Sequence, residues 1–366
     1  MLRIVHYIGS VRFGGIEKVV LDLLKEQKNN SNLKVGIVIG QSKGEFKERF
    51  EELDIPILWA QLSSGYDLNP RKYIGIIKFF RNYDVVHCHC FNLFIAICCC
   101  ISKIKICYTE HGNFGFGREA KKSDSVNRFL LRLFLKYSAT MVTFNSHFTK
   151  EIARSRYLLR ENAGKVIYNG VNFNFYRDTI EARQIQQQLF DYFVIGTSSR
   201  LAGVKRIDRL INAFAKFAQI ADKVKLLIVG MGPKFNELHR IVMERKIQDH
   251  AIFAGFKMNV ADYQELMNIC VFPSQNETFG LVAIEALSLG KPVIVFKDGG
   301  GLAEIVKAVS PEDVVADGEA LVNRMVFYYE NRDVIEQEKK TRIKFAKLFS
   351  IQKMENELYQ LYQEII

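Results

Sequence analysis

The chain has 366 residues, of which 48% are apolar and six are proline, and it carries no low-complexity tract. This composition excludes a disordered protein, and the length exceeds what one hydrophobic core usually organises, so we expect two domains. The 51 basic and 40 acidic residues give a formal charge of +11, which favours a polyanionic partner without distinguishing nucleic acid, phospholipid and phosphorylated substrate.

The seven cysteines do not indicate a disulfide framework, because their number is odd and five of them fall within Cys88–Cys100. We therefore expect reduced thiols in a cytoplasmic protein. No secretory signal is visible, since Met1 leads directly into the strand-like Leu2–His6. The most apolar segment, Phe91–Ile101, is shorter than the roughly 20 residues that a bilayer span needs, so we expect a soluble or peripheral protein.

The first half of the chain alternates short β-like runs with amphipathic patterns such as Glu17–Lys28 and Pro70–Asn82. This alternation is typical of βαβ units with a parallel sheet. The predicted strands of this half are Leu2–Tyr7, Lys34–Ile39, Ile55–Trp59, Val85–His89, Ile104–Thr109, Met141–Phe144 and Lys165–Ile167.

The second half repeats this plan after a polar, weakly patterned stretch, Asn172–Asp191, in which we place the domain boundary. Its predicted strands are Phe193–Thr197, Lys225–Val229, Ala251–Phe253, Val271–Phe272 and Pro292–Phe296. The helices predicted between them are Arg206–Ile220, Pro233–Arg245, Val260–Asn268 and Gly280–Leu289.

Open parallel sheets bind ligands at the carboxyl ends of their strands, so the residues that follow each predicted strand are the candidate site residues. After the first strand, Gly14 and Gly15 allow the backbone to approach a ligand that a Cβ would block. A plain turn is the alternative. The G-x-G-x-x-G spacing of a dinucleotide fingerprint is missing, which disfavours a nicotinamide cofactor.

Glu110 and His111 follow another predicted strand of the first half. A histidine there can donate a hydrogen bond to a substrate hydroxyl or shuttle a proton, whereas the alternative is a ring satisfied by neighbouring backbone. The run His87-Cys-His-Cys90 is not predicted as a zinc site, because on a strand its histidines and cysteines point to opposite faces.

In the second half, Arg200 and Lys205 sit in the turn between a predicted strand and a helix, where two cations can clamp a diphosphate. A solvated basic loop is the competing interpretation. Glu277 and Glu285 frame the later helix start, whose N–H groups and dipole attract an anion. Acids beside an anion site favour a ligand with both phosphate and hydroxyl groups. The alternative makes Glu277 a helix cap and Glu285 a solvated helix residue.

Together these motifs resemble those of glycosyltransferase family 4, which are retaining enzymes of the α/β GT-B fold. The residues that carry the resemblance appear in the family's order: Phe13–Glu17, Thr109–Gly112, Val166–Val171, Arg200 with Lys205, Glu277 with Glu285, and Gly290–Ile294. The resemblance implies two facing Rossmann-like domains with parallel sheets and an interdomain cleft. It also implies an acceptor-side domain over residues 1–171, a nucleotide-sugar-binding domain over residues 172–348, and a closing helix over residues 349–366 that packs back on the first domain.

The resemblance also implies roles for individual residues. It assigns the donor diphosphate to Arg200, Lys205, the backbone N–H groups of Phe279, Gly280 and Leu281, and the opposing Gly14 and Gly15. It assigns hydroxyls of the transferred sugar to Glu277, those of the ribose to Glu285, and a contact near the reacting carbon to His111.

The expected substrate is thus a nucleotide-diphosphate sugar, with no cofactor. Two cations and a helix N-terminus can stabilise the leaving diphosphate, and the chain contains no Asp-x-Asp motif, so we expect metal-independent transfer. Retention of anomeric configuration follows from the resemblance alone.

The acceptor is less constrained by the sequence. Residues 118–165 carry a local charge of +7, and within them Asn127–Lys136 forms a basic amphipathic pattern. Such a helix suits an anionic membrane surface, although a helix packed on its own sheet with a basic edge gives the same pattern.

We therefore expect a cytoplasmic protein, with the inner face of the cell membrane as a candidate peripheral location. The expected acceptor is a glycan, lipid-linked or glycolipid molecule of cell-surface polysaccharide or glycolipid synthesis. The alternatives are a transferase for a soluble sugar or sugar phosphate, and a nonenzymatic nucleotide- or sugar-binding protein. No helix-turn-helix, zinc-finger or aromatic single-strand signature supports a nucleic acid partner.

Overall fold

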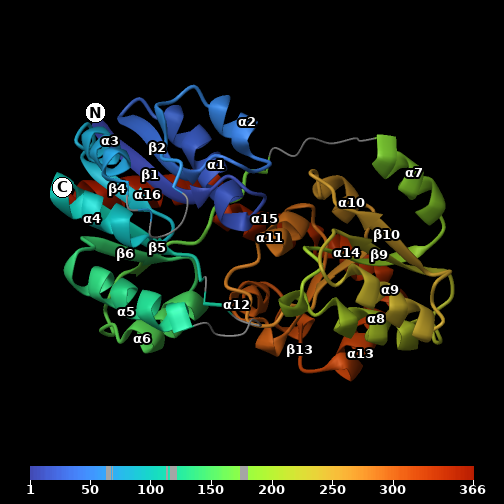
Figure 1. Ribbon diagram of the computed structural model, residues 1–366. Helices are drawn as coiled ribbons and strands as arrows, with labels where there is room; N and C mark the ends of the chain where they lie inside the picture. Colours follow the sequence, from blue (N-terminus) through green and yellow to red (C-terminus); the bar gives the residue numbers. More distant parts are fainter. Residues whose placement is uncertain (63–66, 68, 113, 116–121, 174–179) are drawn as a thin grey trace. The chain divides into compact units, whose positions relative to one another are not determined.

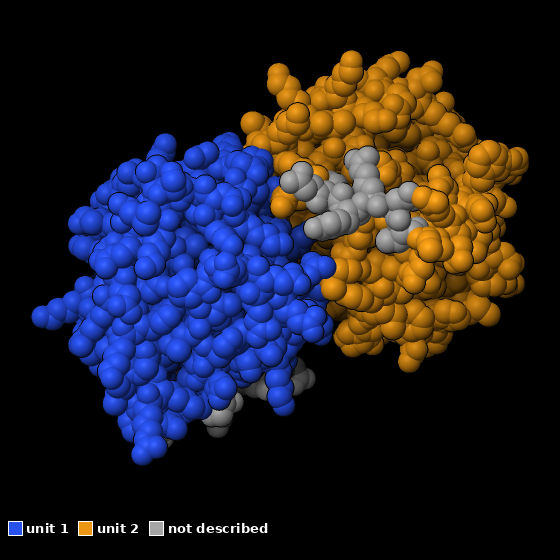
Figure 2. Space-filling view, turned by 90° about the horizontal axis from the view of Figure 1, so that it is seen from above, with its two compact units in different colours: residues 1–171, 350–366 blue, residues 172–349 orange. Residues whose placement is uncertain are grey.

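The computed structural model describes residues 1–62, 67, 69–112, 114–115, 122–173 and 180–366 (Figure 1). The chain divides into two compact units, which Figure 2 colours separately. Unit 1 comprises residues 1–171 and 350–366, and unit 2 comprises residues 172–349. Each unit contains one sheet, and every described strand pair in both sheets is parallel.

Unit 1 has a seven-stranded sheet in the order β3-β2-β1-β4-β5-β6-β7. Its strands are β1 (Leu2–Ser10), β2 (Leu33–Gln41), β3 (Ile57–Trp59), β4 (Val85–Cys88), β5 (Lys105–Glu110), β6 (Met141–Phe144) and β7 (Lys165–Val166). Its helices are α1 (Gly15–Lys28), α2 (Lys47–Glu51), α3 (Pro70–Phe80), α4 (Leu93–Ser102), α5 (Lys122–Tyr137), α6 (His147–Tyr157) and α16 (Ile351–Ile365). The central strand β1 is a nearly continuous buried run, as expected of a parallel sheet covered on both faces.

Helix α16, drawn in red in Figure 1, belongs to unit 1 although it ends the chain. Ser350 caps it by accepting a hydrogen bond from the Lys353 N–H at 3.2 Å. Asn30 Nδ2 donates to Glu355 Oε1 at 3.0 Å, which ties the helix to the turn after α1. Further along, the Tyr362 hydroxyl lies 2.6 Å from His87 Nδ1. The last helix therefore completes the buried polar interior of unit 1.

Unit 2 has a six-stranded sheet in the order β10-β9-β8-β11-β12-β13. Its strands are β8 (Phe193–Ser198), β9 (Val224–Val229), β10 (Ala251–Gly255), β11 (Ile269–Phe272), β12 (Val293–Phe296) and β13 (Val314–Val315). Its α-helices are α7 (Ile180–Leu189), α8 (Ile207–Phe217), α9 (Phe235–Glu244), α10 (Ala261–Glu265), α11 (Leu281–Ser288), α12 (Gly301–Lys307), α13 (Gly318–Glu330), α14 (Arg332–Gln337) and α15 (Lys339–Ala346). Short 3-10 turns are η1 (Gly203–Lys205), η2 (Lys297–Gly299), η3 (Pro311–Asp313) and η4 (Lys347–Phe349).

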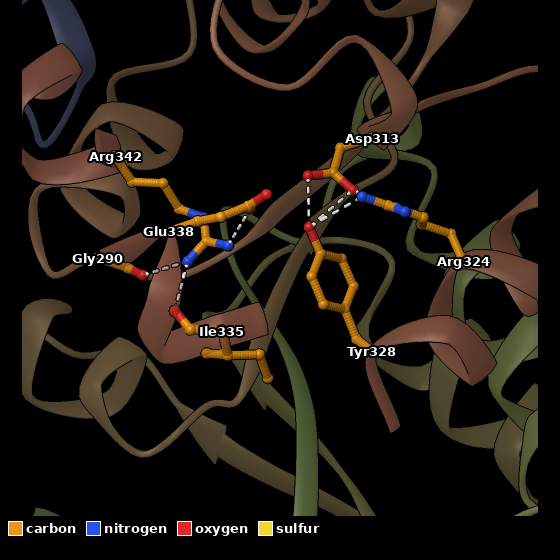
Figure 3. Close-up of polar contacts among 7 residues, drawn as sticks. All are labelled: Gly290, Asp313, Arg324, Tyr328, Ile335, Glu338 and Arg342. Atoms are coloured by element: carbon orange, nitrogen blue, oxygen red, sulfur yellow. Dashed lines mark hydrogen bonds and ion pairs between the residues drawn. The ribbon is translucent and has the colours of Figure 1, made fainter. Parts of the chain in front are cut away.

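Arg342 fastens helix α15 to the end of helix α11 (Figure 3). Its guanidinium is buried, and Nη1 donates to the carbonyl oxygens of Gly290 at 3.0 Å and Ile335 at 2.8 Å. Nη2 donates to Glu338 Oε2 at 2.7 Å. The charge is therefore satisfied by three acceptors, and the turn that ends α11 is held in place.

A second buried cluster in Figure 3 joins helix α13 to the turn before β13. Arg324 Nε donates to Asp313 Oδ1 at 2.6 Å, and the Tyr328 hydroxyl donates to Asp313 Oδ2 at 2.9 Å. Burial raises the pKa of the Asp313 carboxyl, and the Arg324 charge opposes that shift. This contact fixes the edge strand of the sheet to the helix beside it.

The predicted α/β fold with two parallel sheets is confirmed, and each predicted strand overlaps an observed one. Strand β13 was not predicted, because its two residues, Val314 and Val315, lie in an acidic stretch that resembles a loop. Helix α7 lies inside the stretch predicted as a boundary, since its glutamine-rich sequence conceals the few apolar positions. All seven cysteines carry free thiols, as predicted.

Candidate functional site

Three loops at one edge of the unit 2 sheet contact one another. They follow β8, β11 and β12, which are neighbours in the sheet, so their carboxyl ends meet. The hydrogen bonds between the loops run from the Gln275 N–H to the Val204 carbonyl at 2.9 Å, from the Asn276 N–H to the Asp298 carbonyl at 2.8 Å, and from the Gly301 N–H to the Glu277 carbonyl at 2.8 Å. The loops that carry Arg200, Lys205 and Glu277 are therefore parts of one local structure.

Lys205 and Glu277 form an ion pair through Lys205 Nζ and Glu277 Oε2. The two side chains are 19% and 22% exposed, so water screens the pair only in part. An anionic ligand that binds Lys205 must therefore compete with the Glu277 carboxylate. Arg200 lies exposed in the loop after β8 and is available at the surface of the same edge.

Helix α11 begins at Leu281, directly after a glycine with a left-handed backbone. Gly280 has φ 102°, and a Cβ there would lie 2.6 Å from Leu302 Cδ1, so only glycine fits this close approach. Gly280 is the N-cap residue, and no side chain caps the helix, so the alternative that Glu277 is a cap is wrong. Glu285 is 3% exposed, so it is not a solvated helix residue either. Phe279 is buried beside them.

Buried polar atoms without partners mark the same edge of the unit 2 sheet. Among the described residues, Thr197 Oγ1, Ser199 Oγ and Gln264 Oε1 have no hydrogen-bond partner. Gln264 Nε2, in contrast, donates to Ser198 Oγ at 2.8 Å and to the Val282 carbonyl at 3.0 Å. Burying a polar atom without a partner is unfavourable, so these atoms suit a ligand rich in hydrogen-bonding groups. The sequence interpretation missed Gln264, because nothing in its local pattern separates it from a solvated helix residue.

The three remaining predicted site residues, Gly14, Gly15 and His111, belong to unit 1. Gly14 is the N-cap residue of α1 and Gly15 opens the helix, so both lie at the carboxyl end of β1. A Cβ on Gly14 would meet the Glu17 carboxylate. Among the described residues, His111 has no partner at Nδ1, and Asn145 Nδ2 lies 3.4 Å from its carbonyl oxygen.

His111 is the end of a buried histidine chain that the sequence did not predict. His111 Nε2 lies 3.0 Å from His89 Nδ1, and His89 Nε2 lies 2.9 Å from His6 Nδ1. His6 Nε2 lies 2.8 Å from Gln27 Oε1. Because His6 pairs with His87 in the parallel register of β1 and β4, and His89 lies two residues further on, the three rings share one face of the sheet.

These histidines are neutral at ordinary pH. Burial lowers the pKa of His6 and of His111 to about 4, and it lowers the pKa values of His87 and His89 well below the ordinary 6.5. Neighbouring rings add to the lowering at His87 and His89. The candidate site of unit 1 therefore contains neutral imidazoles, whereas the candidate site of unit 2 contains charged side chains.

His6, His87 and His89 also lie close enough together to be compared with a metal site. One ring nitrogen from each can be chosen so that the three lie within 4.8 Å of one another. However, both ring nitrogens of each histidine already have a hydrogen-bond partner; those of His87 are Tyr362 and Thr109, each at 2.6 Å. We predicted no four-ligand zinc site in His87-Cys-His-Cys90 because side chains alternate between the two faces of a strand. The sequence alone did not reveal that His6 joins His87 and His89 in one cluster.

A cavity of about 260 Å³ lies in unit 1 beside the end of the histidine chain. Its polar lining includes His89, Glu110, His111, Arg128, Arg156 and Tyr157. Glu110 is held in place, since it accepts hydrogen bonds from the Gly112 N–H at 2.8 Å and the Tyr157 hydroxyl at 3.2 Å. Cationic, anionic and neutral polar groups together suit a ligand with several hydroxyls.

Solved structures with the same fold are glycosyltransferases of the GT-B class. A structure of Anabaena HepE with UDP-glucose superposes with a TM-score of 0.79 at 21% identity and covers all of both chains. A glycosyltransferase from Rickettsia africae superposes with a TM-score of 0.80 at 20% identity and covers all of this chain and 98% of the other. At these identities the likeness shows the fold, and the fold is GT-B.

Sequence models give the family. Residues 13–175 match the model described as Glycosyltransferase Family 4, and residues 178–347 match the model described as Glycosyl transferases group 1. The chain belongs to glycosyltransferase family 4.

Two curated relatives show the range of named activities. The Bacillus anthracis N-acetyl-alpha-D-glucosaminyl L-malate synthase is 29% identical over 66% of this chain and 64% of its own length. The Schizosaccharomyces pombe phosphatidylinositol N-acetylglucosaminyltransferase gpi3 subunit is 28% identical over 78% of this chain and 64% of its own length. The match thus spans less than two thirds of each relative.

Proposed function

We propose that this protein transfers a sugar from a nucleotide-diphosphate sugar to an acceptor hydroxyl, with retention of anomeric configuration and without a metal. The observation that carries the proposal is the joined set of loops in unit 2, where Lys205 and Glu277 lie beside the start of α11. A cation, a carboxylate and free helix N–H groups fit a ligand that bears both phosphates and hydroxyls. The complexes of Anabaena HepE with UDP and UDP-glucose make uridine donors the first candidates.

In the proposed reaction the acceptor hydroxyl oxygen forms a bond to the sugar carbon as the bond between that carbon and the diphosphate breaks. The hydroxyl proton leaves with the diphosphate, on which negative charge grows. Lys205, Arg200 and the N–H groups at the start of α11 stabilise that charge. Once the diphosphate has taken over Lys205, the Glu277 carboxylate is released from its ion pair and accepts hydrogen bonds from sugar hydroxyls. Buried Glu285 accepts hydrogen bonds from the ribose, and His111 is assigned a hydrogen bond to a substrate hydroxyl.

A panel of nucleotide sugars, with nucleotide release as the readout, tests this function. We expect one donor to be turned over by hydrolysis or transfer, and the rate to persist in excess chelator. A protein that binds a donor without turnover would support the nonenzymatic alternative. Activity that is lost with chelator and restored by a divalent ion would contradict the metal-independent mechanism.

We further propose a lipid-linked or glycolipid acceptor at an anionic membrane surface. Helix α5 packs on the core of unit 1 through Leu131, Phe134 and Leu135. Its opposite side exposes a stripe of large apolar side chains, namely Val126, Phe129, Leu133 and Tyr137. Arg128 and Lys136 are exposed on the same helix, and Lys136 Nζ lies 5.0 Å from the centre of the Tyr137 ring.

This combination of exposed apolar and basic side chains supports membrane association rather than packing alone. In the described part of the chain, no helix has the length and apolar character needed to cross a bilayer. The relative named for phosphatidylinositol supports a lipid acceptor, whereas the relative named for L-malate supports a soluble one. The cavity of unit 1 is the proposed site for the acceptor hydroxyl group.

Flotation with liposomes of neutral or anionic lipid tests the membrane proposal. We expect the protein to float with anionic liposomes at low salt, and the double variant Phe129→Ser, Lys136→Glu to float much less. The matched control is Ile220→Ser with Lys223→Glu, which alters an exposed apolar residue and an exposed lysine of unit 2. Equal flotation of both double variants, or no flotation of the unaltered protein, would remove the support for membrane association.

A further inference from the structure

The histidine chain of unit 1 connects a buried glutamine with a residue that lines the cavity. It runs from Gln27 on α1 through His6 on β1 and His89 after β4 to His111 after β5. His89 and His111 both line the cavity, whereas His6 and Gln27 are fully buried behind them. Each of the three links is 2.8–3.0 Å long, which is a normal hydrogen-bond length.

The direction of these hydrogen bonds follows from simple proton bookkeeping. A neutral imidazole carries one N–H, and the amide oxygen of Gln27 can only accept, so His6 Nε2 donates to it. His6 Nδ1 must then accept from His89 Nε2, and His89 Nδ1 must accept from His111 Nε2. The proton of His111 is thereby placed on Nε2, and Nδ1 keeps a lone pair. Among the described residues this buried nitrogen has no partner.

A ring of the opposite tautomer would break this order. Two lone pairs, or two N–H groups, would then face each other at one of the links. Leaving one buried group unsatisfied disfavours that arrangement by about 5- to 100-fold. The hydrogen-bond direction that satisfies every link of the histidine chain therefore dominates over the opposite one.

We propose that Gln27, His6 and His89 are positioning residues that fix the ring orientation and the tautomer of His111, and so keep its Nδ1 as a hydrogen-bond acceptor for a substrate hydroxyl. This inference rests on the proposed function, in which His111 contacts the substrate. The side chains of Gln27 and His6 are too deeply buried to touch a substrate, so they act only through the chain.

The competing interpretation of the cluster is a metal site made by His6, His87 and His89. Such a site would require each histidine to give up a hydrogen bond at the nitrogen that binds the ion. His87 is also useful as a control. Its ring centroid lies 4.1 Å from that of His89, but its own hydrogen bonds go to Tyr362 and Thr109 and not to His6, His89 or His111.

NMR of the full chain with ¹⁵N-labelled histidine measures the tautomer directly and needs no turnover. We expect the unaltered protein to carry the His111 proton on Nε2. Gln27→Met removes the terminal acceptor at similar volume, and we expect the fraction of His111 protonated at Nδ1 to rise from a minor share to a large one. Gln27→Glu keeps an acceptor and therefore preserves the Nε2 tautomer. The control His87→Gln is expected to leave the tautomer of His111 unchanged.

Three results on the tautomer would overturn the proposal. They are a proton on His111 Nδ1 in the unaltered protein, no change of tautomer in Gln27→Met, and an equal change in His87→Gln. Stoichiometric zinc in the purified protein would also overturn it in favour of the metal site. If Gln27→Met does not fold, His89→Gln interrupts the chain next to His111, and the same mixing of tautomers is expected. If the His111 proton is found on Nε2 but the protein turns over no nucleotide sugar, the proposed function is rejected. The assignment of the His111 tautomer then still stands.

Discussion

The candidate sites of the two units differ in charge and in burial. In unit 2 the candidate residues are charged and partly exposed, as in the Lys205–Glu277 ion pair and the exposed Arg200. In unit 1 they are neutral and buried, because burial keeps the pKa of His6 and of His111 near 4. A charged site is suited to an anionic diphosphate, whereas a neutral hydrogen-bonding site is suited to hydroxyls.

The two units also hold their candidate site residues in position by different interactions. Unit 2 places its charges on loops that are tied together by backbone hydrogen bonds and supported by the buried Arg342 at the end of α11. Unit 1 arranges its rings through side-chain hydrogen bonds between neighbouring strands. Substitutions in the candidate site of unit 2 should therefore affect function by changing its charge. Substitutions in that of unit 1 should affect function by changing which groups donate and which accept hydrogen bonds.

The largest effect is expected from Lys205→Ala. Removing a preorganised donor to developing negative charge lowers turnover by about 100- to 1,000-fold, and we expect that loss in kcat with the active donor. The control is Lys234→Ala, which breaks the ion pair of Lys234 with Glu237 elsewhere in unit 2. Steady-state kinetics should show less than about twofold change for the control. Equal losses of kcat in Lys205→Ala and Lys234→Ala would show that the effect does not depend on where in unit 2 the lysine lies.

The next effect, on stability instead of turnover, is expected when unit 1 is acidified. The folded pKa values of His6 and His111 are lowered, so between about pH 6.5 and pH 4 the unfolded chain binds more protons than the folded one. Their stabilising contribution is therefore complete above about pH 6.5 and is lost as the pH falls toward 4. A shift of this size corresponds to roughly 3 kcal/mol of unfolding free energy for each ring.

The single tryptophan makes this measurement specific to unit 1, since Trp59 lies in β3. Urea unfolding followed by Trp59 fluorescence should show a falling midpoint as the pH is lowered through this range. A His6→Gln variant should lose less stability on acidification, because one titrating ring is gone. A midpoint that does not change with pH would contradict the neutral, buried state of the histidines.

The smallest effect is expected for nucleotide affinity in Glu277→Gln. The carboxylate competes with a diphosphate for Lys205, so neutralising it should tighten the binding of UDP by about two- to fivefold. The same change should weaken sugar transfer, because an amide is a poorer acceptor for sugar hydroxyls. Calorimetric titration of UDP checks the first expectation. Weaker binding of UDP would show that Glu277 supports the nucleotide rather than competing with it.

The sequence predicted the strands and loops well, because apolar runs followed by glycine and polar residues have a local signature. It also identified Lys205 and Glu277 separately, but their ion pair joins residues 72 positions apart and depends on the order of β8 and β11. The histidine chain could not be predicted for the same reason. Only the register of β1 against β4 brings His6 beside His87 and His89.

Burial in the structure also bears on alternatives that local patterns left open. Glu285 looked like either a ligand or a solvated residue, and its burial excludes the solvated one. Helix α5 looked like either a packed helix or a membrane-binding one, and the structure shows a packed face together with an exposed apolar stripe. Burial depends on tertiary packing, so no pattern along the chain can supply it.

The central claim is that unit 2 uses its own charged side chains to drive transfer from a nucleotide sugar. Nucleotide release by the unaltered protein and by Glu277→Ala, measured with the active donor in excess chelator, tests it most directly. We expect the unaltered protein to keep its full rate, and Glu277→Ala to lose about 10- to 100-fold through the missing hydrogen bonds to the sugar. Full turnover by Glu277→Ala, or no turnover without a divalent ion, would contradict the account.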